Sequence, residues 1–159
     1  MIAAKSLNGV IGRGEDIPWQ AKGEQLLFKA LTHQQWLLVG RKTFESMGLL
    51  ANRNFVVISR TKNIPSHDRV LVYPDLEQAL AEMKNRTNLL FVAGGGQLYQ
   101  QMIDRADQLI VSTIRDEVVG DIYFPSIGPE FKRVYQQFFP SNIDYDFEIW
   151  QRQNELTGA

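Results

Sequence analysis

Short apolar runs that alternate with helical patterns are the feature of this sequence that most constrains its fold. Five runs lack the polar–apolar alternation of a half-exposed strand, so each is typical of a strand that is covered on both faces. They lie at residues 36–39, 55–59, 70–73, 89–93 and 109–114. Helical patterns at residues 23–31 and 41–47, and others after Asp75 and Gly96, precede or follow most of these runs. Such a series indicates parallel strands that are connected by helices.

The two ends of the chain complete this α/β pattern. Residues 2–4 form a short apolar strand, and residues 131–139 and 145–151 alternate in part, as an antiparallel pair does. We therefore expect a three-layer α/β fold, with a central, mostly parallel mixed sheet of about eight strands, an antiparallel C-terminal edge and about four flanking helices. Asp75 and Gln78 form a capping-box pattern that begins the helix after the third run.

Composition excludes several classes of protein. At 159 residues the chain is expected to be a single domain over residues 1–159, and a net charge of −1 provides no global attraction for nucleic acid or an anionic membrane. The absence of cysteine and the presence of only two histidines make a metal site unexpected. No apolar run approaches the length of a membrane helix, and the apolar start of the chain is too short for a signal peptide. We expect a cytoplasmic monomer without a nucleic-acid or membrane partner.

Two glycine-bearing turns follow buried strands and could bind an anion. One is residues 39–43 (Val-Gly-Arg-Lys-Thr) and the other is residues 92–97 (Val-Ala-Gly-Gly-Gly-Gln). Unpaired N–H groups at a helix start favour phosphate, and glycine lets the backbone approach it closely. Neither turn is a Rossmann fingerprint, because Tyr99 stands where the third glycine belongs. Positive charge at Arg41, Lys42 and Arg60 suits an extra ribose phosphate, so NADPH fits better than NADH. Each turn could also be only a tight connection, and each cation only a surface residue.

Residues 16–29 carry the candidate acid. Glu24 lies in the first turn of a helical pattern, one turn before Phe28, so one carboxylate could stand at the edge of an apolar surface. A flat heterocycle with an amide or a cationic group would suit such a pocket. The alternative is an ordinary solvated glutamate, which a helix N-terminus also favours. Arg53, in a loop before a strand, could clamp a carboxylate bidentately or could lie on the surface.

These motifs stand in the order found in one known family. They are residues 8–12, residues 17–19, Glu24 with Phe28, residues 39–48, Arg53, residues 94–99 and residues 120–125. Each is modest alone, but the ordered set is specific, and the chain resembles dihydrofolate reductase over nearly its whole length. Residues 22–29 and 35–38 are more similar still to the trimethoprim-insensitive reductases that plasmids and integrons carry. The sequence departs from the family at Glu24, where bacterial chromosomal members usually have Asp, and at Gln97, which replaces a frequent Arg.

The resemblance implies hydride transfer from NADPH to 7,8-dihydrofolate. Glu24 would bind the ring amide and amino group of the pterin and act as the acid, with Trp19 and Ser112 as further catalytic residues. Burial would raise the pKa of Glu24 whereas the helix N-terminus would lower it, and the sequence leaves this balance open. The implied substrate-binding residues, where antifolate inhibitors are also expected, are Ile2, Glu24, Leu27, Phe28, Lys29, Met47, Arg53 and Ser112.

The resemblance also implies the cofactor site. Residues 10–19 would close over the nicotinamide, Asp121 would organise a loop that supports this closing loop, and the Gly94–Gly95 peptide bond would be cis. The implied NADPH-binding residues are Ala4, Ile11, Gly12, Asp16, Ile17, Gly40, Arg41, Lys42, Thr43, Ser59, Arg60, Ala93, Gly94, Gly95, Gly96, Gln97, Leu98 and Tyr99.

Two alternatives remain open from the sequence. A related NADPH-dependent pyrimidine reductase of riboflavin synthesis shares the strand and the Gly-Gly turn, but it should lack an acid that matches Glu24 followed by Phe28. A non-catalytic dinucleotide-binding module would need only the two turns, and Glu24 would then be a solvated residue.

Overall fold

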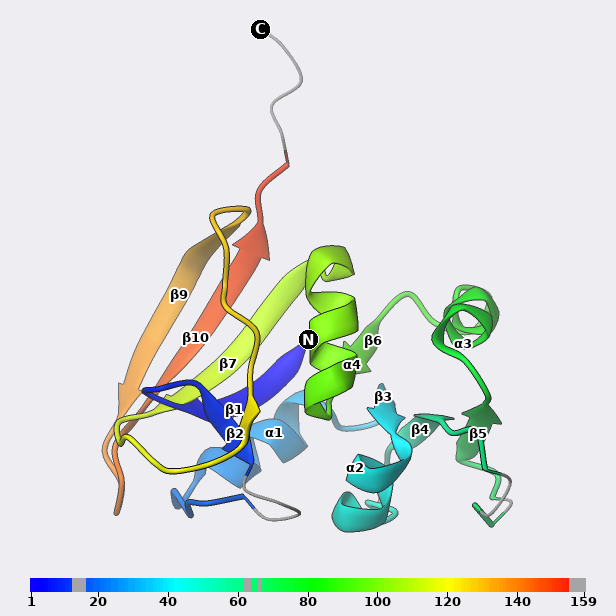
Figure 1. The fold of residues 1–159 in the computed structure, drawn as a ribbon, viewed down its shortest axis with the longest axis horizontal. Coiled ribbons are helices and arrows are strands. Elements are labelled where there is room, and N and C mark those ends of the chain that lie inside the picture. The colour runs from blue at the N-terminus through cyan, green and yellow to red at the C-terminus, as the bar shows by residue number, and fades with distance from the viewer. Residues whose placement is uncertain (13–16, 62–63, 66, 155–159) are drawn as a thin grey trace, which may run out of the picture.

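Two four-stranded sheets stand on either side of helix α4 (Gly96–Met102) and make up most of the structure (Figure 1). The computed structural model describes residues 1–12, 17–61, 64–65 and 67–154. The first sheet has the order β1 (Ile2–Ser6), β7 (Gln108–Ile114), β10 (Tyr145–Arg152) and β9 (Phe131–Phe139). The second has the order β5 (Val70–Tyr73), β4 (Asn54–Ile58), β3 (Trp36–Gly40) and β6 (Leu90–Val92). A small ribbon pairs β2 (Val10–Gly12) with β8 (Ile122–Tyr123).

The strand directions confirm a mostly parallel α/β fold with an antiparallel C-terminal edge. The pairs β1–β7, β3–β4, β3–β6 and β4–β5 are parallel, whereas β10 runs antiparallel to both β7 and β9. The remaining helices are α1 (Glu24–Leu31), α2 (Arg41–Met47) and α3 (Leu76–Met83), and the short 3-10 helix η1 (Ile103–Arg105) follows α4. The predicted capping of α3 is confirmed, because the Gln78 N–H donates to Asp75 Oδ1 at 2.8 Å. None of the helices that the structure describes is long and apolar enough to cross a membrane.

The single central sheet of about eight strands that the sequence predicts is not confirmed. The described residues form ten strands, and hydrogen bonding leaves β1 and β6 at the edges of two separate sheets. At this edge of the first sheet, the Tyr99 hydroxyl of α4 donates to the Ile2 carbonyl of β1 at 2.7 Å. This backbone acceptor of β1 is therefore satisfied by a phenol rather than by a strand. Strand β1 is longer than the predicted residues 2–4, because it pairs with β7 as far as Ser6.

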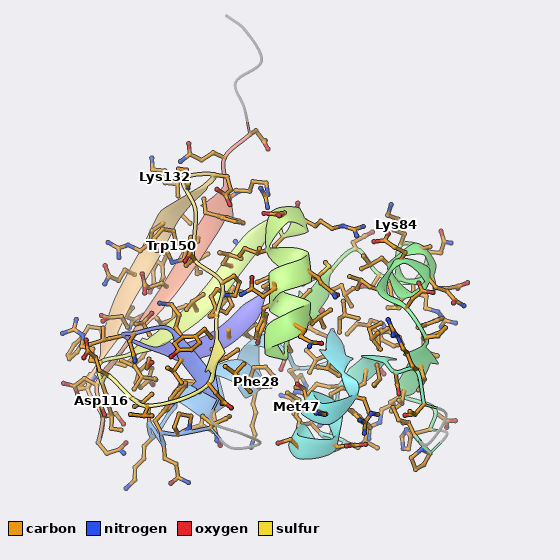
Figure 2. All side chains as sticks on the ribbon, in the orientation of Figure 1. Phe28, Met47, Lys84, Asp116, Lys132 and Trp150 are labelled. Atoms are coloured by element: carbon orange, nitrogen blue, oxygen red, sulfur yellow. The ribbon has the colours of Figure 1, made fainter. Side chains whose placement is uncertain are left out.

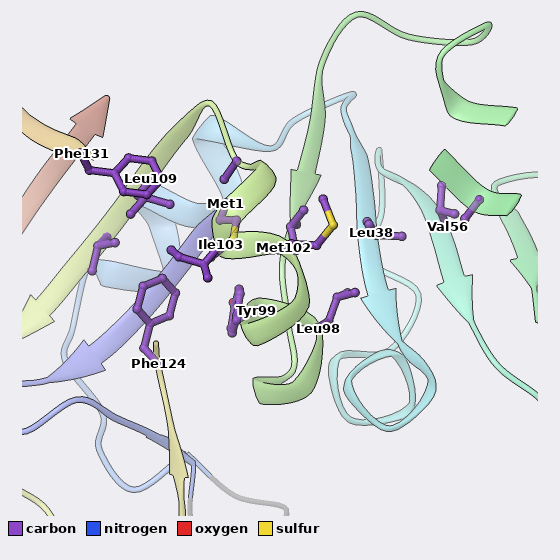
Figure 3. Close-up of a cluster of buried hydrophobic side chains, with 14 of the residues drawn as sticks. Met1, Leu38, Val56, Leu98, Tyr99, Met102, Ile103, Leu109, Phe124 and Phe131 are labelled. Carbon is purple, nitrogen blue, oxygen red and sulfur yellow. The ribbon is translucent and has the colours of Figure 1, made fainter. Parts of the chain in front are cut away.

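The main core lies around α4 and connects the two sheets. Figure 3 shows Tyr99, Met102 and Ile103 between Leu109 on one side and Leu38 and Val56 on the other. Leu38, Val56 and Leu109 are fully buried. Apolar burial on both faces of α4 therefore fixes the spacing of the two sheets. This spacing in turn sets where residues of both sheets pack against α1 and α2.

Candidate active site

A second apolar cluster lies against α1 and α2 and draws residues from both sheets. Its buried members include Ile2 of β1, Val39 of β3 and Val57 of β4. Phe28 of α1 and Met47 of α2 are only partly buried and pack against it, and Figure 2 labels both side chains. Three of the residues that the resemblance implies for substrate binding, Ile2, Phe28 and Met47, are thus brought together on one apolar surface.

Glu24 stands at the start of α1 in a half-buried position. Gly23 before it has φ +93°, a left-handed conformation that glycine adopts at little cost. Burial raises the pKa of Glu24 above the usual 4.5, and a hydrogen bond with the Ser112 side chain lowers it in part. Ser112 lies on β7 and is 4% exposed. Desolvation therefore prevails in the balance that the sequence leaves open, and the carboxyl group retains a proton to higher pH than an exposed glutamate does.

The segment that leads into α1 is held by residues that sequence reasoning missed. The Lys22 N–H donates to Asn142 Oδ1 at 2.8 Å, and Asn142 Nδ2 donates to the Gln20 carbonyl at 2.6 Å. The Ser141 hydroxyl donates to the Lys22 carbonyl at 2.8 Å. Trp19 is buried in an apolar cluster with Tyr145 of β10. The turn between β9 and β10 therefore sets where α1 begins, and no local sequence pattern marks these residues.

Arg53 is buried rather than exposed, at 7%. Its Nε donates to Thr32 Oγ1 at 3.1 Å and its Nη1 to the Ala51 carbonyl at 2.6 Å, while its Nη2 donates to the Lys29 carbonyl. A guanidinium has five N–H groups, so these three bonds leave one N–H on each terminal nitrogen for a further acceptor. The surface alternative for Arg53 is thus wrong, and a fixed fork remains that could take a carboxylate bidentately.

The two glycine-bearing turns meet at adjacent strand ends. The Gly40 N–H donates to the Gly94 carbonyl and the Ala93 N–H to the Leu38 carbonyl, each at 2.9 Å. The Gly94–Gly95 peptide bond is cis, as predicted. A Cβ on Gly95 would lie 3.0 Å from Thr43 Oγ1, so the hydroxyl of one turn contacts the backbone of the other.

Ser59 and Arg60 line a separate pocket after β4. Thr61, Ile64, Val72 and Pro74 complete the lining of this pocket of about 300 Å³. The Ser59 hydroxyl donates to the Thr61 carbonyl at 2.8 Å, which fixes the turn. Arg41 instead pairs with Glu45 at 3.0 Å on the exposed side of α2. Of these two predicted phosphate-binding arginines, Arg60 is therefore the one that lines a pocket.

The other residues implied by the resemblance are spread more widely. Lys29, Lys42 and Gln97 are exposed, as is Ile17 at 63%, whereas Leu98 and Tyr99 are buried in the core around α4. Ala4 and Leu27 pack against the cluster that contains Trp19, and Ile11 packs against the α4 core. The Asp121 N–H donates to the Gly12 carbonyl at 3.2 Å, at the start of the expected closing loop. Asp16 lies outside the described residues. No group of three or more His, Cys, Asp or Glu side chains in the described part of the chain could hold a metal.

Comparisons with known proteins point to one family. The family described as dihydrofolate reductase matches residues 1–152. Dihydrofolate reductase type 15 of Escherichia coli is 54% identical over 96% of this chain and 97% of that protein. Dihydrofolate reductase type 6 of Proteus mirabilis is 50% identical with the same coverage. Among solved structures, dihydrofolate reductase from Enterococcus faecalis, complexed with NADP(H), has a TM-score of 0.87 at 27% identity and covers 96% of this chain and 95% of its own.

The family match spans residues 1–152, and it sets aside the pyrimidine reductase and the non-catalytic module as alternatives for this chain. The chain belongs to the dihydrofolate reductase family and reduces dihydrofolate with NADPH.

Proposed function

We propose that 7,8-dihydrofolate is reduced beside Glu24, on the apolar surface that Ile2, Phe28 and Met47 form. One observation carries this assignment: Glu24 is a desolvated carboxyl group at the edge of that surface, and burial raises its pKa. An acid that is protonated more easily than usual can supply or relay the proton that the pterin ring must gain. Ionised, the same group accepts hydrogen bonds from the ring amide and amino group, which orients the ring.

The remaining substrate contacts are part of the same proposal. Phe28 and Leu27 flank the ring from α1, and the two free N–H groups of Arg53 hold the α-carboxylate of the glutamate tail. Lys29 lies on the exposed side of α1, where it adds positive charge to the approach of that tail. Ser112 holds the Glu24 carboxylate in place, and Trp19 packs behind the segment that begins α1.

The described residues fit NADPH. Gly94 has φ +114°, and a Cβ there would meet the Tyr99 hydroxyl at 3.3 Å, so this position of the turn favours glycine. We infer that the N–H groups at the start of α2 and α4, with Thr43 and Lys42, bind the pyrophosphate, and that Ser59 and Arg60 bind the ribose phosphate. NADPH supplies the hydride when it is bound. We expect Ala4, Ile11 and Ile17 to contact the cofactor where residues 10–19 would exclude water. The Asp121 N–H, which donates to the Gly12 carbonyl, would support that loop.

We also propose that trimethoprim binds this enzyme weakly. The diaminopyrimidine of trimethoprim needs the same carboxylate as the pterin, and Glu24 carries it one methylene farther from α1 than an aspartate would. A compact two-ring inhibitor must therefore shift on the apolar surface, at the expense of its other contacts. We expect Glu24→Asp to lower the inhibition constant for trimethoprim, and an inhibition constant that stays the same would contradict this explanation.

The direct test follows the absorbance of NADPH with and without dihydrofolate. We expect NADPH oxidation to depend on dihydrofolate. We expect Arg53→Ala to slow it by raising the KM for dihydrofolate. Lys84→Ala serves as the control, because Lys84 is an exposed cation after α3. An unchanged KM in Arg53→Ala would remove Arg53 from the site.

We further propose that the enzyme is a cytoplasmic monomer that binds no nucleic acid. The net charge of −1 supports the absence of nucleic-acid binding.

A further inference from the structure

Arg69, just before β5, extends its side chain to the segment between α2 and β4. Its Nη1 donates to the Leu50 carbonyl at 2.8 Å and to the Arg53 carbonyl at 2.9 Å. The Arg69 backbone is itself fixed, because its carbonyl accepts from the Phe55 N–H at 2.7 Å and its N–H donates to His67 Nδ1 at 3.0 Å. The guanidinium is thus a cross-link between the start of β5 and two points of one loop.

The two carbonyls that Arg69 holds enclose a tight turn. Asn52, between them, has φ +61°, which is unusual for a residue other than glycine. The Asn52 carbonyl accepts from the Gln34 N–H at 2.7 Å. A strained turn keeps its shape only where its surroundings fix it. The bonds from Arg69 on both sides of Asn52 provide that constraint.

Both ends of this turn carry side chains of the candidate substrate site. Leu50 packs against the same apolar cluster as Phe28 and Met47. Arg53 is held on its other side by Thr32, whose hydroxyl accepts from Arg53 Nε and donates to the Phe28 carbonyl at 2.7 Å. Arg69 therefore acts on the backbone of Arg53 and Leu50, while Thr32 and the Lys29 carbonyl act on the guanidinium.

We propose that Arg69 is a positioning residue for the glutamate end of dihydrofolate. It touches no part of the substrate; it sets the backbone from which Arg53 clamps the tail carboxylate and Leu50 contacts the ring that precedes it. The inference rests on the role proposed for Arg53. A bidentate clamp needs both N–H groups in register with a carboxylate, so a small shift of the Arg53 backbone weakens it.

A purely structural role for Arg69 makes a different prediction. Loss of two hydrogen bonds to backbone carbonyls would then lower the melting temperature and impair all ligands alike. A positioning role is selective, because the hydrogen bonds described for residues 50–53 run to Arg69, to α1 and to the segment before β3, and not to Glu24 or the two glycine-bearing turns. Substrates that lack the glutamate tail should therefore be insensitive to Arg69.

The experiment compares Arg69→Met, Arg69→Lys and the control Arg86→Met, which changes an exposed arginine beyond α3. Kinetics are measured with dihydrofolate and with a dihydropterin that has no benzoylglutamate tail, and NADPH affinity is measured by fluorescence. We expect Arg69→Met to raise the KM for dihydrofolate about tenfold, the scale of losing one charge-assisted hydrogen bond. Its kcat, its kinetics with the tail-less pterin and its NADPH affinity should stay as in the unchanged enzyme. Arg69→Lys should restore part of the KM, since an ammonium can still reach a carbonyl.

Equal losses with both pterins, or an unchanged KM for dihydrofolate, would overturn the proposal. A double variant separates it from the assignment of Arg53. If Arg53 is the clamp, Arg53→Ala alone raises KM and adding Arg69→Met raises it little further. If Arg53→Ala has no effect while Arg69→Met does, the role of Arg53 fails and the positioning role fails with it.

Discussion

Strand β7 separates two carboxylates with opposite surroundings. Ser112 is directed to Glu24 on one face of the sheet. Thr113, the next residue, is directed to the other face, together with its register partner Asp146 of β10, which pairs with Arg115. Arg115 Nε and Nη2 donate to the two oxygens of Asp146 at 2.7 and 2.9 Å, and the pKa of Asp146 is lowered, chiefly by this hydrogen bonding. The pKa of Glu24 is raised by burial.

The difference shows that one face of this sheet carries a stabilising ion pair and the other face carries the candidate acid. A buried carboxylate that has a guanidinium partner remains ionised and stabilises the fold. A buried carboxylate that has only a hydroxyl partner resists ionisation and is available to a substrate. Successive side chains of a strand point to opposite faces, so Ser112 can contact the acid on one face while Thr113 belongs to the ion-pair region on the other.

The largest expected effect tests the Glu24 side. We expect Glu24→Gln to cut turnover by about two to four decades, the scale of losing an acid–base group, because the amide cannot release or take up the proton. NADPH affinity should be unchanged. Glu82→Gln on the exposed face of α3 is the matched control. Near-normal turnover in Glu24→Gln, measured in a single-turnover experiment, would sink the assignment.

Stability should move in opposite directions at the two carboxylates. Glu24 has a raised pKa in the folded state, so its ionisation destabilises the fold. This loss of stability begins as the pH rises through the unfolded value of 4.5 and is complete above the folded value. Asp146 has a lowered pKa, so it contributes stability above the unfolded value of 3.8 that is lost as the pH falls through the folded value. At neutral pH we expect Glu24→Gln to raise the melting temperature and Asp146→Asn to lower it. Shifts of the same sign in thermal unfolding would break the comparison.

The smallest expected effect compares the two neighbours on β7. Ser112→Ala removes a hydrogen bond that lowers the pKa of Glu24, so the pH–rate profile should move to higher pH. Thr113→Val removes a bond of 2.8 Å from the Thr113 hydroxyl to Glu148 on the far face. It should lower the melting temperature and leave the pH–rate profile in place. A profile that shifts in Thr113→Val would show that the two faces are coupled.

Most elements of the fold were predictable because their signals are local, and the site residues were assigned through the family resemblance. Periodicity placed the helices and most strands, and the turn at Gly94 and the pair Glu24–Phe28 are short patterns with a known chemical use. Contacts between distant residues carry the rest. At the edge of β1, the hydrogen bond from Tyr99 to Ile2 joins residues that are 97 positions apart in sequence. Asn142 and Arg69 are single polar residues in loops, and no pattern distinguishes them from surface residues. The pKa of Glu24 needed the burial that only the folded chain provides.

The most direct test of the account is the titration of Glu24 itself. Carboxyl signals of 13C-labelled glutamate are followed by NMR across pH, and the Glu24 signal is the one that disappears in Glu24→Gln. The account predicts a midpoint above the usual 4.5. A midpoint at or below that value would mean that the carboxylate is solvated or paired, and Glu24 could not then be the acid of this enzyme.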